Sequence, residues 1–134
     1  MNNFLSFLII FIALDMVIVV FLYRTFRSPY KKISTEKRSY FKKIFDDITT
    51  TSDYKMKLIE YDSLLNTILT ERNIQGTLAE QLKQYAPQTP YEDDIWKAHK
   101  LRNKVVHEIS YEPSKKELQE ALGVFQKIIP WVLK

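Results

Sequence analysis

The sequence predicts an all-α protein in which a single N-terminal transmembrane helix is followed by a small up-and-down helical bundle. An apolar run of 20 residues, Phe4 to Tyr23, has the length of a membrane-spanning helix. After this run, apolar residues recur at the spacing of amphipathic helices, and no segment shows the alternation of a strand. The chain contains only two glycines, Gly76 and Gly123, which argues against a turn-rich β fold.

The apolar run predicts a membrane anchor, residues 1–24, with a defined orientation. No lysine or arginine precedes the run, whereas eight follow between residues 24 and 43. By the positive-inside rule, the N-terminus lies outside and the remainder of this single-pass chain lies on the cytoplasmic side of the cell membrane. A cleaved signal peptide is less favoured, because the run lacks a preceding basic region and a small-residue cleavage site.

One acidic residue, Asp15, falls near the middle of the predicted span. A carboxylate at that depth costs about 2.5–3.5 kcal/mol on insertion scales, so we expect it to be protonated or paired. Two interpretations stay open. Asp15 contacts another membrane helix, or it is a tolerated polar residue in a very apolar span.

The net charge of +4 comes from one short segment. Residues 24–43 carry eight basic side chains and one acidic one, 8 − 1 = +7, whereas residues 44–134 carry 12 basic and 14 acidic ones, 12 − 14 = −2. Asp15 accounts for the remaining −1. A basic segment directly after a membrane span is expected to face anionic lipid headgroups. Binding of nucleic acid by this segment is the weaker interpretation, since lipid competes for the same charges.

A linker and a helical domain are expected after the anchor. Pro29 interrupts the helical pattern, which predicts a basic juxtamembrane linker over residues 25–34. The cytoplasmic bundle then covers residues 35–134. Its first helix is predicted over residues 35–49, and its second over residues 54–72, with an N-cap supplied by the TTTSD stretch and with Gly76 ending it. Residues at helical spacing support these two helices: Tyr40, Phe41, Ile44, Phe45, Ile48, Leu58, Tyr61, Leu64, Leu65, Ile68 and Leu69.

Three capping-box patterns predict the starts of the later helices. They are TLAE at residues 77–80, TPYE at residues 89–92 with Pro90 at the first helical position, and SKKE at residues 114–117. In each pattern the hydroxyl accepts from the backbone N–H three residues on, while the glutamate reaches back. We expect Pro130 to kink or end the last helix and to leave WVLK as a tail. The bundle therefore has four main helices and a short one.

Residues 95–109, in the helix that the TPYE pattern is predicted to open, include side chains that need an explanation. On a helical wheel, Arg102 falls within the apolar face, where an unpaired charge is costly. It therefore needs a carboxylate partner, and Asp62 and Glu60 are the candidates. His99, Asn103 and His107 form a polar seam with Trp96 at the boundary of that face. This seam is either an ordinary boundary strip or a site. The apolar face itself consists of Ile95, Ala98, Leu101, Val105, Val106 and Ile109, and the solvated face of Lys97, Lys100 and Lys104.

The stretch RNKVVH, Arg102 to His107, resembles the arginine–polar–spacer–histidine motif of the HEPN superfamily. The resemblance covers about residues 50–130 and includes the position of the motif on a late helix. It implies a HEPN-like bundle that is often dimeric and in many members cleaves RNA without a metal. Carried over residue by residue, it makes Arg102, Asn103 and His107 catalytic, and we place Asp62, His99 and Glu108 in supporting positions.

The chemistry of metal-independent RNA cleavage fits these residue types. Histidine can act as base or acid near neutral pH, and arginine donates a rigid pair of N–H groups to phosphate. The ribose 2′-OH that such a reaction needs selects RNA over DNA. Arg102 and His107 lie about 140° apart on one helix, so they cannot easily meet at one phosphate by themselves. A two-fold dimer, which the resemblance implies, would solve this by forming a composite groove, and the wheel is compatible with it.

Other functional classes find little support. Without cysteine, thiolate nucleophiles and cysteine-based zinc sites are excluded, and two histidines make a closed zinc site unfavourable. We expect no metal and no small-molecule cofactor. The expected partners are the lipid bilayer, a second copy of the chain and RNA. The alternative function is a non-catalytic membrane-tethered bundle that dimerises or recruits a partner.

Overall fold

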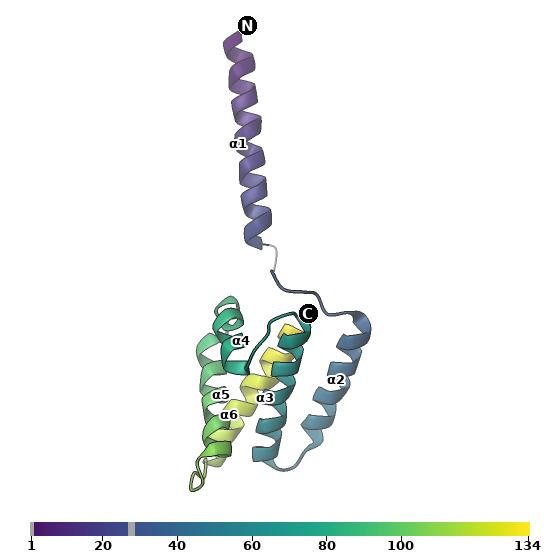
Figure 1. Ribbon diagram of the computed structural model, residues 1–134, viewed down its shortest axis with the longest axis vertical. Helices are drawn as coiled ribbons and strands as arrows, with labels where there is room; N and C mark the ends of the chain where they lie inside the picture. The colour runs from purple at the N-terminus through teal and green to yellow at the C-terminus, as the bar shows by residue number, and fades with distance from the viewer. Residues whose placement is uncertain (1, 27–28) are drawn as a thin grey trace. The chain divides into compact units, whose positions relative to one another are not determined.

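A computed structural model describes residues 2–26 and 29–134, and the chain divides into two units, residues 1–30 and 31–134. The first unit consists of helix α1, Asn2–Phe26 (Figure 1). Its stretch Leu5–Tyr23 is the one helix of the described residues that is long and apolar enough to cross a membrane, and the side chains from Leu5 to Tyr23 are exposed. The predicted apolar N-terminal helix is therefore confirmed.

The second unit is a bundle of five α-helices, α2 to α6, with one 3-10 turn, and strands are absent from the part of the chain that the structure describes. The elements are α2 (Thr35–Thr50), α3 (Tyr54–Glu71), α4 (Leu78–Tyr85), η1 (Ala86–Gln88), α5 (Glu92–His107) and α6 (Lys115–Val132). The predicted all-α bundle of four main helices and one short helix is confirmed.

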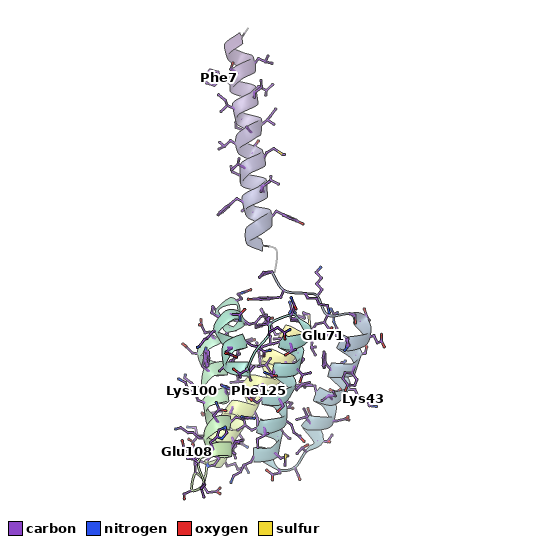
Figure 2. All side chains as sticks on the ribbon, in the orientation of Figure 1. Phe7, Lys43, Glu71, Lys100, Glu108 and Phe125 are labelled. Atoms are coloured by element: carbon purple, nitrogen blue, oxygen red, sulfur yellow. The ribbon has the colours of Figure 1, made fainter. Side chains whose placement is uncertain are left out.

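Helix α3 forms the centre of the bundle. It packs against α6, α2 and α5, and α5 in turn packs against α6 (Figure 1). Phe125 of α6 meets the Tyr61 ring at 6.3 Å (Figure 2). Five side chains of α3 are completely buried: Leu58, Tyr61, Leu65, Ile68 and Leu69. Because α3 is covered on several sides, any polar side chain that it directs inward must find a protein partner.

The bundle begins before α2. The backbone N–H of Lys31 donates to the carbonyl of Arg72 over 3.2 Å, and the side chain of Ile33 is buried. The last residues of the predicted linker therefore pack with the helices.

Side-chain caps begin four of the helices, three of them as the sequence predicts. Ser34 caps α2, and Asp53, the last residue of TTTSD, caps α3. The predicted capping boxes at Thr77 and Ser114 are both present, with Glu80 and Glu117 as their acidic partners. Each such cap satisfies N–H groups that have no partner within the helix.

The third predicted capping box, at Thr89, is wrong. The Thr89 hydroxyl donates to the carbonyl of Ala86 over 2.9 Å and accepts from the N–H of Tyr91. Helix α5 begins at Glu92 after Tyr91, which makes no side-chain cap. The hydroxyl is engaged by the preceding 3-10 turn, so Thr89 closes η1 and does not open α5.

Two predicted helix ends also need correction. Asn73, with a φ of 66°, ends α3, because its N–H and that of Ile74 donate back to Thr70 and Leu69 in a Schellman arrangement. Gly76 comes later, in the turn before α4. Helix α6 continues through Pro130 to Val132, whose side chain is buried. The predicted WVLK tail is therefore wrong, since burial of Val132 and Leu133 holds this end on the bundle.

Candidate functional site

Helix α5 carries the residues of interest and is anchored by two apolar side chains. Ile95 and Ala98 are buried, which fixes the face that α5 turns toward α3 and α6. His99 and Arg102 follow at positions next to this anchor. They face α3, as their contacts with Asp62 show. Lys100 lies on the exposed side of the same helix (Figure 2).

Asp62 of α3 is the buried acid of the site. Only 4% of the residue is exposed, and its two carboxylate oxygens have different partners on α5. Oδ1 lies 2.8 Å from Nδ1 of His99, which is itself buried, and Oδ2 lies 3.3 Å from Nε of Arg102. The predicted need of Arg102 for a carboxylate is confirmed, and the partner is Asp62. The other candidate, Glu60, accepts from the Thr51 hydroxyl instead.

Arg102 is held by charge more than by hydrogen bonding to that acid. Its Nε is buried and, within the described residues, forms no hydrogen bond, so the contact with Asp62 is an ion pair without hydrogen-bond geometry. Its Nη1 donates to Oδ1 of Asn103 over 3.0 Å. The side chain is 23% exposed, which leaves part of the guanidinium accessible.

Asn103 closes a ring of four polar side chains. Its Oδ1 accepts from Arg102, and its Nδ2 lies 3.1 Å from Nε2 of His99. The sequence of contacts runs from Asp62 to His99, to Asn103, to Arg102 and back to Asp62. We call these four residues the polar ring. Three of them lie within one and a half turns of α5, and α3 supplies the fourth.

An open polar pocket of about 490 Å³ lies beside the polar ring. It is bounded by α3, the start of α4 and α5. Besides the four ring residues, it is lined by Ser63, Asn66, Thr67, Thr77, Leu78 and Ala79. The pocket therefore offers hydroxyl, amide and guanidinium groups, while the carboxylate of Asp62 neutralises the charge of Arg102.

His107 and Glu108 lie outside this pocket. His107 is the last residue of α5 and is exposed, and residues 29–134 provide it with no hydrogen bond or ion pair. Glu108 follows it at the end of the helix and is also exposed (Figure 2). The structure thus brings Asp62, His99, Arg102 and Asn103 together, but within one chain it does not add His107 or Glu108 to them.

The residues of the polar seam on the helical wheel differ in how deeply they are buried. His99 is 6% exposed, Asn103 is half-buried and His107 is exposed. The rings of Trp96 and His99 are close to perpendicular, with centroids 6.2 Å apart. The predicted apolar face also ends before the helix does, because Val106 is 43% exposed and Ile109 is fully exposed.

Several polar residues beside the ring were not predicted. Gln81 of α4 is completely buried and bonds Asn66, Thr70 and the carbonyl of Ile74. Ser63 and Thr67 line the pocket from α3. The signal in the sequence for the α3 residues was a polar stripe at helical spacing beside the apolar face of the same helix: Asp62, Ser63, Asn66, Thr67 and Thr70.

The acidic groups of the capping boxes show how local hydrogen bonds act on titration. Donation from the backbone and hydroxyl of Thr77 lowers the pKa of Glu80. In the second box, the hydroxyl and backbone of Ser114 lower the pKa of Glu117.

Among the described residues, no group of three His, Asp or Glu side chains could hold a metal ion.

Comparison of the chain with protein-family models, with curated proteins and with solved structures finds no match. The HEPN resemblance therefore rests on residues 102–107 and their setting, and it stays a prediction.

Proposed function

We propose that this chain is a membrane-anchored, HEPN-like ribonuclease that cleaves RNA without a metal as a two-fold dimer. Arg102 and Asn103 of one copy contact the phosphate, and the His107 side chains of the two copies carry out the proton transfers of the reaction. The observation that carries the proposal is the contrast along α5: Arg102 and Asn103 are held in place beside an open pocket, whereas His107 is exposed and has no partner in residues 29–134.

The surroundings of His107 support a dimer at this end of α5. Val106 precedes it and is 43% exposed, and Ile109, two residues after it, is fully exposed. Exposed apolar side chains beside a functional residue favour coverage by a second protein surface. A two-fold axis near His107 would bring two copies of the helix together and supply two histidines to one site.

Two histidines suffice for the proton transfers of the reaction. One imidazole accepts the proton of the ribose 2′-OH as its oxygen attacks phosphorus. The other donates a proton to the 5′-oxygen as the P–O5′ bond breaks, which leaves a 2′,3′-cyclic phosphate. The guanidinium of Arg102 stabilises the negative charge that develops on the phosphoryl oxygens.

RNA cleavage by the full chain in detergent micelles, with EDTA present, tests this proposal. We expect products that end in a 2′,3′-cyclic phosphate and no cleavage where deoxyribose replaces ribose. His107→Ala should lower the rate by about 10²-fold or more. The matched control is Lys100→Ala, an exposed cation on the same helix, which should keep the rate. Absence of cleavage at high protein concentration, or unchanged cleavage by His107→Ala, would refute it.

A second function, a non-catalytic bundle that recruits a partner at the membrane, is favoured by one observation. Arg102 is the partner of a buried carboxylate, which is a structural role. In that case Arg102→Ala lowers stability and no RNA is cleaved under any condition. For both functions we propose that α1 crosses the membrane once, with its N-terminus outside and the basic segment at the cytoplasmic face.

A further inference from the structure

Both ring nitrogens of His99 are engaged, which defines its protonation state. Nδ1 lies 2.8 Å from a carboxylate oxygen of Asp62, which can only accept while it is ionised. A lone pair on Nδ1 would face that oxygen unfavourably, so Nδ1 carries a proton. Nε2 lies 3.1 Å from Nδ2 of Asn103. An amide nitrogen only donates, so Nε2 carries the lone pair.

Arg102 determines which way the Asn103 amide faces. Nη1 of Arg102 can only donate, so the atom of Asn103 that lies 3.0 Å from it must be the oxygen. The amide nitrogen then necessarily points to Nε2 of His99. The polar ring is thus consistent with one arrangement of protons, in which His99 is neutral and protonated on Nδ1.

We propose that His99 is a positioning residue which acts on Arg102 through Asn103, and that protonation of His99 releases the guanidinium of Arg102 from Asn103. The arrangement of protons in the polar ring does not depend on whether the chain cleaves RNA. Only its consequence for phosphate binding rests on the proposed function.

Protonation of Nε2 is incompatible with the closed ring. The new N–H would face the Nδ2 donor of Asn103, so the amide must turn to present its oxygen to His99. Its nitrogen then faces Nη1 of Arg102, and two donors cannot bond each other. The guanidinium loses this hydrogen bond and becomes free to turn toward the pocket, while its charge contact with Asp62 persists.

The charged and titratable groups around His99 are few. Asp62 faces it from α3, and Arg102 approaches the same carboxylate from α5. The pocket residues of α4 and the turn before it, Thr77, Leu78 and Ala79, carry no charge. Among the hydrogen bonds and ion pairs of His99 in the described residues, Asp62 is therefore the charged partner.

Long-range ¹H–¹⁵N NMR spectra of the full chain in detergent micelles test the tautomer directly. The chain has only two histidines, and His107→Gln leaves His99 as the only one. A ring nitrogen with a proton resonates far from one with a lone pair. At neutral pH we expect separate signals for His99, protonated at Nδ1 and unprotonated at Nε2. A proton on Nε2 with a bare Nδ1, or one averaged signal, would overturn the proposal.

Asn103→Asp, in the same His107→Gln background, tests the coupling. A carboxylate at this position accepts from Arg102 and from Nε2 of His99 at once, so both nitrogens of His99 should become protonated at neutral pH. The control Gln119→Asp adds the same charge to an exposed residue of α6 that does not line this pocket, and it should leave the His99 signals unchanged. Neutral His99 in Asn103→Asp, or the same change in the control, would contradict a role for Asn103.

Acid titration of the His107→Gln chain gives a second measurement that needs no change in the polar ring. As the pH is lowered through the step in which His99 gains its second ring proton, the side-chain signals of Asn103 and Arg102 should shift together with those of His99. Affinity for a short RNA that cannot be cleaved should rise by about tenfold over that step, because a charged hydrogen bond to phosphate becomes available. If His99 is protonated and the Arg102 signals do not change, the positioning role of His99 is overturned. If the signals of His99, Asn103 and Arg102 change together but the chain binds no RNA, only the proposed function is contradicted.

Discussion

At the scale of single residues, Asp62 is the group on which the candidate site depends. It is the buried carboxylate that meets both His99 and Arg102, and an isolated charge at such a position would be very unfavourable. The stability of the site and its geometry are therefore linked, because every change of partner alters the environment of this one acid.

Arg102→Ala should lower the free energy of unfolding by about 3 kcal/mol, near the lower limit for breaking a buried ion pair. The lower limit applies because His99 still bonds Asp62 and because Arg102 is partly exposed. Chemical denaturation of the full chain in micelles, followed by tryptophan fluorescence, measures the loss. Lys100→Ala, which removes an exposed cation from the same helix, should stay within about 0.5 kcal/mol. Equal stability of the two variants would contradict the pairing.

The residue-scale contacts were only partly predictable. The position of Arg102 on the apolar face of the wheel required a carboxylate, and Asp62 was one of the two candidates, with Glu60. The wheel could not show that His99 is buried while His107 is exposed, because both lie at the edge of the apolar face and depth depends on which helices pack nearby. The hydrogen bond between Asn103 and His99 could not be predicted either, because it depends on the burial of His99.

At the scale of helices, local capping explains most of the boundaries. The two capping boxes at Thr77 and Ser114 were predictable because their bonds join residues only three apart. The pattern at Thr89 failed because the hydroxyl had a competing local partner, the carbonyl of Ala86. A sequence pattern indicates that a cap can form, and the conformation of the preceding turn decides whether it does.

The second capping box predicts a pH-dependent contribution to stability. Bonds from Ser114 lower the pKa of Glu117, so its stabilisation is complete above the ordinary glutamate pKa of 4.5 and is lost as the pH falls through the lowered value. The difference in melting temperature between the natural chain and Glu117→Ala should therefore be largest near neutral pH and shrink in acid. Gln119→Ala, an uncharged change in the same turn, should give a difference that is constant with pH.

The two glycines of the chain predict opposite effects of the same substitution. Gly76 has a φ of +106°, and a Cβ there would lie 2.6 Å from Oε2 of Glu80, so Gly76→Ala should destabilise the protein by about 1–3 kcal/mol. Gly123 lies within α6, and a Cβ there meets nothing within 4 Å. Gly123→Ala should stabilise it by about 0.5–1 kcal/mol. Thermal unfolding of both variants checks the pair, and a stabilised Gly76→Ala would show that this turn is not strained.

At the scale of the whole molecule, the proposed insertion of α1 into a membrane would determine where the bundle acts. The long apolar helix and the bundle were both predictable, because their signals are periodicity and length within short windows. A dimer could not be deduced in the same way, since one chain shows which apolar side chains are exposed but not what covers them. Exposed Val106 and Ile109 are the features that such an interface would use.

The proposed orientation can be tested because the chain contains no cysteine. Single changes Asn3→Cys and Ser110→Cys place one thiol before the span and one in the exposed turn after α5. A membrane-impermeant maleimide applied to right-side-out membrane vesicles should label the first and spare the second, and detergent should expose the second. Labelling in the opposite order would mean the reverse orientation. Labelling of both in sealed vesicles would show that the chain does not cross the membrane.

The closed polar ring also predicts how its four residues vary among related sequences. Each of its four side chains completes the hydrogen-bonding or charge requirement of its neighbours, so loss of one leaves two others unsatisfied. Relatives that share this site should therefore carry Asp62, His99, Arg102 and Asn103 as a set, or should have replaced several of them together. His107 is free of the ring and can vary independently, which gives sequence comparison a way to distinguish a structural motif from a catalytic one.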